Sequence, residues 1–211
     1  RDWSSDVCSS DLNEPGFERL FNGHDLAGWN ILLGPNCPYT GDTCAQTEPL
    51  DDLRVDGQTI VCECHIHGHL YTDKKYRNFT FRQDIKYYRP DEFVPEQNDN
   101  EELYSGGGGW LLFTNFTRPG AFPRFMELEG RYRDMLELPG GKGPAGKLDL
   151  EAKRKAMRPL GWWNSMEVSQ KDGTMVTKLN GAVVSLLKPT DWNYADYQSG
   201  HLGIQVQGAK M

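Results

Sequence analysis

Hydrophobic and polar residues alternate along short stretches of the chain, with the period of two that half-buried β-strands show. Tight-turn dipeptides separate the stretches: Asp-Gly at 56–57 and 172–173, and Asn-Gly at 180–181. Such dipeptides favour two-residue hairpin loops. The pattern predicts strands over residues 53–64 (two short strands), 70–88, 110–116, 125–132, 165–171, 174–179, 182–187 and 201–206.

Only residues 148–157 show a helical period, so we expect an almost entirely β chain, folded as a sandwich or a barrel. The length of 211 residues fits one domain, and the 23 glycines and 11% aromatic residues suit strands and turns. The net charge of −7 comes without a basic stripe, which argues against duplex nucleic acid as a partner. No apolar run reaches the length of about 18 residues that a membrane-spanning helix needs.

The two ends of the chain look unlike the rest. Residues 1–12 (RDWSSDVCSSDL) have no apolar period and resemble a translated sequencing adapter. We therefore expect 1–12 to be a non-native segment and 13–211 to be one β-sandwich domain. Because the last residues run as an apolar strand up to Met211, we expect this domain to be truncated at its C-terminus.

Four cysteines remain once Cys8 is set aside with that segment. Cys37 and Cys44 flank a Pro/Gly/Thr loop, and we expect them to form a disulfide, the alternative being two reduced thiols. Cys62 is expected to be a small buried residue. A bridge from Cys62 to Cys64 is discounted because residues so close have poor disulfide geometry.

Seven segments in order carry a resemblance to a known family. They are GFERLFNGHDLAGW (16–29), DGQTIVC (56–62), GHLYTDKKYRNFTFRQDIKY (68–87), SGGGGWLLF (105–113), PRFMELEGRYRD (123–134), GWWNSMEVSQKDGTMVTKLNG (161–181) and GHLGIQVQG (200–208). Together they resemble the 3-keto-disaccharide hydrolase family. The resemblance implies a concanavalin A-like jelly-roll sandwich of two antiparallel sheets, export from a bacterial cell, and action on sugars oxidised to a ketone at C3. Members of the family act as hydrolases or as lyases and hydratases.

Such chemistry needs a general base, because the ketone makes the C2 proton acidic and its removal lets the C1 substituent leave. Glu127 and Glu129 are two residues apart on a predicted strand, so both carboxylates should lie on one face. In the resembled family the position of Glu127 is commonly Glu and that of Glu129 commonly Gln, which makes Glu127 the preferred base. Asp134 is the third candidate catalytic carboxylate. The alternative is that these residues form the solvated outer face of an edge strand.

Other side chains are candidates for substrate binding. Arg124 is placed to bind an enolate or ring oxygens, and Gln205 and Gln207 to bind sugar hydroxyls. Trp110 and Trp163 are the stacking candidates for a sugar ring, with Trp162, Trp192 and Tyr194 as further ones, although core or rim packing is the commoner role of tryptophan. Residues 106–109, four glycines, lack the Lys-Ser/Thr ending of a phosphate loop and suit a close backbone approach or a sharp turn.

His65, His67 and His69 alternate, so a continuous strand would aim three imidazoles to one side, as in a catalytic zinc site. A divalent metal is therefore the one cofactor considered. The alternative is a polar strand end, since relatives in the resembled family lack this set and Gly68 interrupts it.

The leading hypothesis is an exported enzyme that cleaves 3-keto-glycosides, with a small carbohydrate as its partner. A non-catalytic carbohydrate-binding module on the same sandwich is the alternative, because fold does not fix function. A structural domain of a larger exported protein is the third interpretation. The oligomeric state is not indicated by the sequence.

Overall fold

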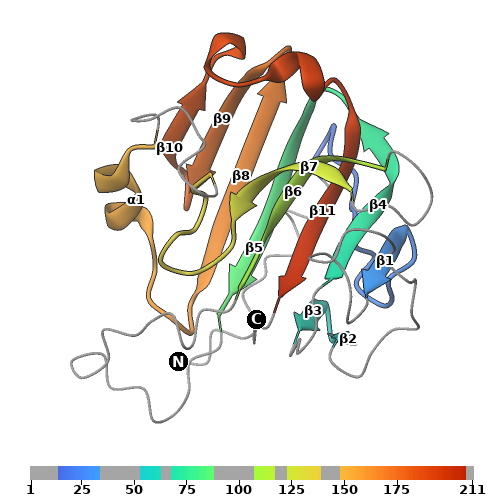
Figure 1. The fold of residues 1–211 in the computed structure, drawn as a ribbon. Helices are drawn as coiled ribbons and strands as arrows, with labels where there is room; N and C mark the ends of the chain where they lie inside the picture. The colour runs from blue at the N-terminus through green and yellow to red at the C-terminus, as the bar shows by residue number, and fades with distance from the viewer. Residues whose placement is uncertain are drawn as a thin grey trace.

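The computed structural model describes residues 14–33, 53–62, 68–87, 107–116, 123–138 and 148–207. They form two stacked antiparallel sheets and a separate two-stranded hairpin (Figure 1). The five-stranded sheet has the order β1-β4-β11-β6-β7, and the four-stranded sheet the order β10-β9-β8-β5. The predicted class, an all-β sandwich of two antiparallel sheets with at most one short α-helix, is confirmed.

The five-stranded sheet is assembled from segments that are far apart in the sequence. Its last strand, β11, pairs with both β4 and β6, and β7 forms an edge. The predicted strand from residue 110 begins three residues earlier, because glycines 107–109 belong to it. The strands are β1 (Trp29–Leu33), β4 (Gly68–Tyr76), β6 (Gly107–Asn115), β7 (Arg124–Glu129) and β11 (Gly200–Gln207).

The four-stranded sheet contains the predicted meander. Its hairpins turn at Asp172-Gly173 and Asn180-Gly181, where all four residues have positive φ, as two-residue hairpin loops of this kind require. The predicted hairpin around Asp56-Gly57 is confirmed as β2 and β3. The strands are β5 (Phe79–Lys86), β8 (Trp163–Lys171), β9 (Thr174–Leu179) and β10 (Ala182–Leu187), with β2 (Leu53–Asp56) and β3 (Thr59–Cys62) in the hairpin.

The long strand predicted over residues 70–88 is two strands in different sheets. β4 ends at Tyr76, and β5 starts at Phe79 on the opposite layer. The Asn78 side chain fixes this crossing, since its Oδ1 accepts from the backbone N–H of Asp172 at 3.0 Å. Period-two patterning alone does not reveal such a break, because both strands keep the same alternation.

The main core fills the space between the sheets. Trp110 lies in it, 1% exposed, and its indole N–H donates to Oε1 of Gln83 at 2.8 Å. The sugar-stacking role expected for Trp110 is therefore wrong, because this ring faces the opposite sheet. The neighbours in this core include Phe81, Leu112, Met126, Leu128, Met166, Val168, Leu179 and Leu202.

One short α-helix, α1 (Leu150–Ala156), lies in the described part of the chain and confirms the helical segment expected at 148–157. Asp149 caps it, accepting from the backbone N–H of Ala152 at 2.9 Å. The helix packs beside edge strand β10. Two 3₁₀ turns, Pro189–Asp191 and Tyr194–Asp196, lie between β10 and β11.

Candidate functional site

The outer face of the five-stranded sheet, which points away from the core, carries the candidate site. Residues directly opposite one another in antiparallel strands share a face. The strand registers place two rows across this face. One row is Leu32, His69, Gln205, Gly109 and Glu129, and the next is Asn30, Tyr71, Gly203, Leu111 and Glu127.

Glu127 and Glu129 are on this face, while Met126 and Leu128, which alternate with them along β7, are buried in the core, as the alternation predicted. Gly109 makes room for Glu127. A Cβ added to Gly109 would meet Oε1 of Glu127 at 2.7 Å and the backbone oxygen of Leu128 at 2.9 Å. Gly109 thus permits a close approach to the backbone, which was one of the two interpretations of the glycine stretch. The group that approaches it is the Glu127 carboxylate of this chain.

The protonation of Glu127 is strongly perturbed. Burial, and after it the negative charge of Glu129, raises the pKa of Glu127 from its usual 4.5 to about 7, while Arg131 partly opposes the rise. A carboxyl group with this pKa is present in both forms near neutral pH. It can therefore take up or release a proton under physiological conditions.

Arg131 is a site residue that the sequence reasoning missed. Its Nε lies 3.5 Å from Oε2 of Glu129 and 3.6 Å from Oδ2 of Asp134. Asp134 also pairs with Arg133, at 3.3 Å. The expected carboxylates Glu129 and Asp134 are therefore joined through one guanidinium. The signal that could have found Arg131 is its spacing, two residues after Glu129 and three before Asp134.

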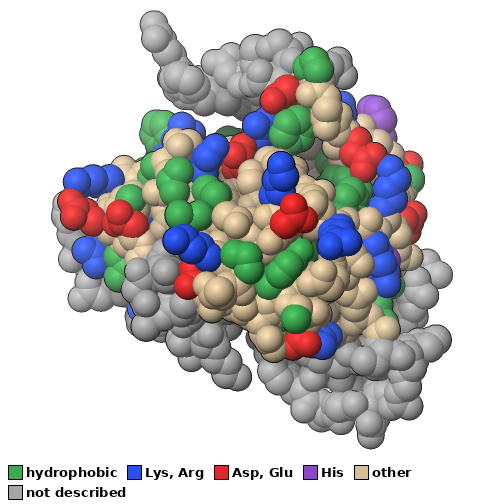
Figure 2. All heavy atoms as spheres, turned by 90° about the horizontal axis from the view of Figure 1, so that it is seen from above, with side chains coloured by type: hydrophobic (Ala, Val, Ile, Leu, Met, Phe, Trp, Pro, Cys, Tyr) green, Lys and Arg blue, Asp and Glu red, His purple; other side chains and the backbone are tan. Residues whose placement is uncertain are grey.

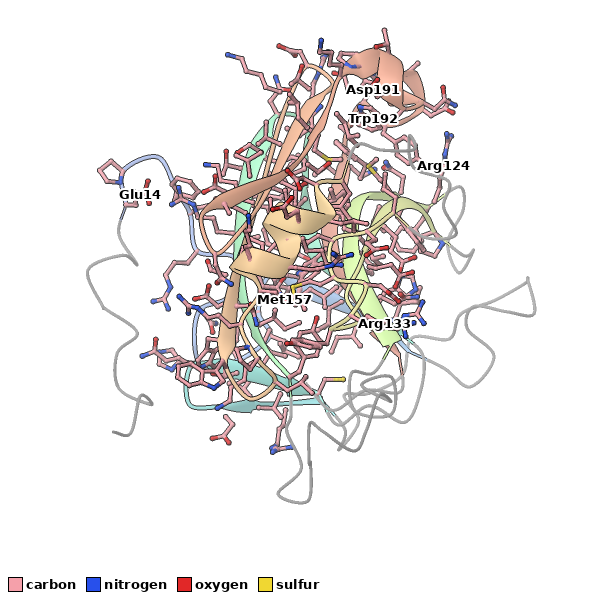
Figure 3. All side chains as sticks on the ribbon, turned by 90° about the vertical axis from the view of Figure 1, so that its left-hand side faces the viewer. Glu14, Arg124, Arg133, Met157, Asp191 and Trp192 are labelled. Carbon is pink, nitrogen blue, oxygen red and sulfur yellow. The ribbon has the colours of Figure 1, made fainter. Side chains whose placement is uncertain are left out.

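Arg124 lies elsewhere, which corrects the expectation that it binds substrate next to Glu127. It alternates to the other side of β7, pairs with Asp196 at 2.7 Å and stacks over the Tyr197 ring at 5.0 Å. Figure 3 shows Arg124 and Arg133 at opposite ends of β7, with Arg124 near Trp192. The cation of the site comes from the turn after β7.

Gln205 lies in the first row, opposite both His69 and Gly109. It is buried, and among the described residues its Oε1 has no hydrogen-bond partner. A buried acceptor without a donor is costly, and it suits a ligand that brings a hydroxyl group. The backbone of Gln207 continues β11, opposite residue 107, but its side chain lies outside the described residues.

His69 is fully buried in the same row, and its ring meets the edge of the Phe125 ring at 5.4 Å between centroids. Burial lowers its pKa to about 4, so the imidazole is neutral at pH 7. His65 and His67 lie outside the described residues, so the proposed three-histidine metal site is not tested. Among the described residues, no three His, Cys, Asp or Glu side chains are grouped closely enough to hold a metal ion.

The aromatic residues of this face are not the tryptophans expected from the sequence. Tyr71 packs against Phe116 at 4.9 Å and against His201 at 5.3 Å between ring centroids. Phe125, which contacts His69, is on the same side of β7 as Glu127. Their signal in the sequence was weak, because Tyr71 and Phe125 read as ordinary strand residues.

Trp163 begins β8 in the other sheet and faces that sheet's outer side, where the ammonium of Lys86 lies 5.9 Å from its ring. The expected role of Trp163 in binding sugar at Glu127 is therefore wrong. Trp162 is exposed, and Trp192 donates to the backbone oxygen of Gly173 at 2.9 Å. Tyr194 packs on the same Gly173, so neither residue joins the two rows.

Cys62 is buried, as expected, and is disulfide-bonded. Its partner lies outside the described residues, as do Cys37 and Cys44, so the expected bridge between those two stays a prediction. The structure corrects one part of the expectation, since Cys62 is part of a covalent bridge in addition to being a small core residue.

Charged side chains of both signs lie on the surface of the described residues. Figure 2 shows acidic and basic side chains interspersed on the face seen there. In the described ranges, no helix combines the length and apolar character needed to cross a membrane.

One comparison with a solved structure shows the fold, and two weaker likenesses accompany it. A protein from Parabacteroides distasonis ATCC 8503, proposed to be a glycosyl hydrolase, has a TM-score of 0.59 at 22% identity, covering 90% of this chain and 87% of its own. A second such protein from the same organism has a TM-score of 0.43 at 16% identity, covering 84% of this chain and 90% of its own. The carbohydrate-binding module CBM66 from Bacillus subtilis has a TM-score of 0.43 at 10% identity, covering 86% and 89%.

No curated protein matches the chain. The family comparison does give a match, described as a 3-keto-alpha-glucoside-1,2-lyase-like domain, over residues 16–211. This range contains all seven segments on which the family resemblance was based. The chain belongs to the family of 3-keto-alpha-glucoside-1,2-lyase-like domains.

Proposed function

We propose that this chain cleaves 3-keto-glycosides, with Glu127 as the general base. The observation that carries the proposal is the placement of Glu127. It is half-buried over Gly109, its pKa is raised to about 7, and Glu129 and the Arg131 cation are its charged neighbours. A buried carboxylate with such a pKa is a stronger base than an exposed one and is still ionised in part at neutral pH.

The reaction begins with transfer of the C2 proton of the keto sugar to the Glu127 carboxylate. The electron pair of the C–H bond becomes an enolate on the C3 oxygen. Collapse of the enolate expels the C1 oxygen, which takes up the proton that Glu127 removed from C2, and leaves a C1–C2 double bond conjugated with the ketone. This sequence is an elimination. Addition of one water molecule, its hydroxyl at C1 and its hydrogen at C2, then gives the same products as hydrolysis.

Arg131 supplies positive charge where the enolate forms, the role expected of Arg124 from the sequence. The Arg131 side chain is 42% exposed, whereas the Glu129 side chain is 15% exposed and Gln205 is buried. Substrate therefore enters from the edge at β7. Asp134 contacts Arg131 at 3.6 Å, and Glu129 is the second carboxylate, which can relay the proton from Glu127 to the leaving oxygen. Gln205 binds a sugar hydroxyl through its free Oε1.

The test is release of the aglycone from a chromogenic 3-keto-glucoside. Replacing Glu127 by Gln should lower kcat by about 10²–10⁴-fold, the range that general base catalysis contributes. Glu151→Gln on α1 is the matched control, because that carboxylate is exposed and pairs with Lys155 on the same helix. Release that Glu127→Gln leaves unchanged would exclude Glu127 as the base.

Elimination and direct displacement at C1 are distinguished by the fate of the C2 hydrogen. Turnover in deuterated water, followed by NMR, should place deuterium at C2 of recovered or hydrated sugar if Glu127 removes that proton. Protium retained at C2 through complete turnover would favour displacement at C1.

The second candidate is a carbohydrate-binding module without catalysis. The aromatic rings of Tyr71, Phe116 and Phe125 on the site face favour sugar binding whichever chemistry follows. Calorimetry with unoxidised glycans and with 3-keto-glycosides separates the two functions. Binding without any turnover of the keto sugar would support the module.

We also propose that the protein is exported to the periplasm or the cell exterior. The disulfide at Cys62 supports this, because disulfides persist in oxidising compartments. Recovery of the protein from a periplasmic or culture fraction of its host, with Cys62 resistant to alkylation before reduction, is the test.

A further inference from the structure

The turn after β7 carries the Arg131 cation and closes on itself at its base. The backbone N–H of Leu136 donates to the oxygen of Glu129, and that of Glu129 donates to the oxygen of Glu137, both at 2.7 Å. Leu136 has a φ of 67°, a left-handed conformation that a branched residue adopts only where its surroundings enforce it. Residues 130–137 are therefore held in shape by contacts from outside the turn.

One of these contacts comes from α1. Lys153 is 3% exposed, an unusual position for a lysine. Its ammonium donates to the backbone oxygen of Arg133 at 2.8 Å and to Oε1 of Glu137 at 2.7 Å. Both acceptors belong to the turn, one in its middle and one at its base. Lys153 thus connects α1 to the segment that lies between Glu129 and Asp134.

We propose that Lys153 is a positioning residue of the candidate active site: it holds the 130–137 turn so that the guanidinium of Arg131 stays beside the Glu127–Glu129 pair. Only the expected effect of Lys153 on catalysis depends on the proposed function. The positioning itself is a property of the free protein and is measured without substrate.

The alternative is a purely structural role, in which Lys153 stabilises the packing of α1 and leaves the site unaffected. A buried ammonium is a poor way to gain stability alone, because its desolvation offsets the ion pair. An ammonium that bonds a backbone oxygen and a carboxylate of the same turn fixes the path of that turn. The path matters because Arg131 contacts Glu129 through a single Nε at 3.5 Å, too loose a contact to fix the guanidinium alone.

The quantity to measure is the titration midpoint of Glu127, which depends on the charged and titratable groups on its face. Among the described residues these are Glu129 on its own strand, Arg131 and Asp134 from the turn, and His69 and Tyr71 from β4. Strand β6 contributes no charged residue opposite Glu127. Arg131 lowers the pKa of Glu127, so displacing its charge should raise the titration midpoint above about 7.

The experiment is a carbon-detected NMR titration of the Glu127 carboxyl, assigned with Glu127→Gln, in wild type, Lys153→Met, Lys155→Met and Arg131→Gln. Lys155→Met is the matched control, because Lys155 is exposed on the same helix and pairs with Glu151 of that helix. We expect Lys153→Met to raise the midpoint by about half a pH unit, roughly a three-fold change in proton affinity, and Lys155→Met to leave it unchanged.

The double variant, Lys153→Met with Arg131→Gln, shows whether Lys153 affects the pKa of Glu127 through Arg131. If Lys153 acts through Arg131, the double variant titrates like Arg131→Gln alone. An unchanged midpoint in Lys153→Met, or an equal rise in both backgrounds, overturns the proposal. Should Lys153→Met fail to fold, Glu137→Gln is the second variant, because it loosens the same contact. It should also raise the titration midpoint of Glu127. An unchanged midpoint in Glu137→Gln would equally overturn the proposal. If the protein does not turn over 3-keto-glycosides, the proposed function fails. The titration still tests the positioning role of Lys153, because it is measured without substrate.

Discussion

The carboxyl group of Glu127 lies directly over the backbone of Gly109, so close that a Cβ on that glycine would come within 2.7 Å of Oε1. The two residues are on neighbouring strands, β7 and β6, and belong to adjacent rows of one sheet face. A position without a side chain in β6 thus gives a carboxylate from β7 its half-buried place.

Gly109→Ala should therefore disturb the site at its centre. The added methyl group meets the Glu127 side chain and the oxygen of Leu128, and overpacking of this kind costs about 1–3 kcal/mol of unfolding free energy. Urea unfolding measures the loss. In a Glu127→Ala background the same change should cost less, because one of the two clashes is gone. Equal costs in both backgrounds would show that Glu127 does not occupy this place.

Glu127→Gln should stabilise the protein at alkaline pH while it strongly lowers kcat. Because the pKa of Glu127 is raised, folding favours its neutral form, and this group makes the protein less stable as pH rises from about 4.5 to about 7. Glutamine does not ionise, so the Glu127→Gln variant does not lose this stability as the pH rises. Urea unfolding at pH 5 and pH 8 should give a gain for Glu127→Gln that is larger at pH 8, and a gain that is equal or larger at pH 5 would contradict the raised pKa.

Arg131 and Arg124 should differ sharply on substitution. Arg131→Gln removes the cation beside Glu129, so kcat/KM for a 3-keto-glucoside should fall by about 10²–10³-fold, and the rise of the rate with pH should move above pH 7. Arg124→Gln breaks the ion pair with Asp196 at the far end of β7 and should leave the pH profile in place. Reversed effects would return the substrate-binding role to Arg124.

Gln205→Met should separate stability from binding. The buried Oε1 of Gln205 has no hydrogen-bond partner in the described part of the chain, and removing such an acceptor relieves a cost of about 1–3 kcal/mol. We expect a higher midpoint of thermal unfolding together with a higher KM or a weaker calorimetric affinity for the sugar. A variant that is less stable and binds sugar as wild type does would show that the amide serves the fold.

Several features followed from the sequence because they depend on neighbours in the chain. Alternation fixed the opposite sides taken by Met126 and Glu127, and the Asp172-Gly173 and Asn180-Gly181 turns set the registers of the meander. The carboxylates Glu127 and Glu129 share a face for the same local reason.

Only the tertiary structure decided which distant residues meet them. The break between β4 and β5 at Arg77-Asn78 sends consecutive strands to different sheets, and β11 then lies between β4 and β6. Those pairings put His69 and Gln205 in the row of Glu129, and they send Trp110 into the core and Trp163 to the other sheet. The choice between Arg124 and Arg131 depended on the path of the turn after β7. Strand order and loop path are set by long-range packing, and the periodicity within a single strand does not indicate either of them.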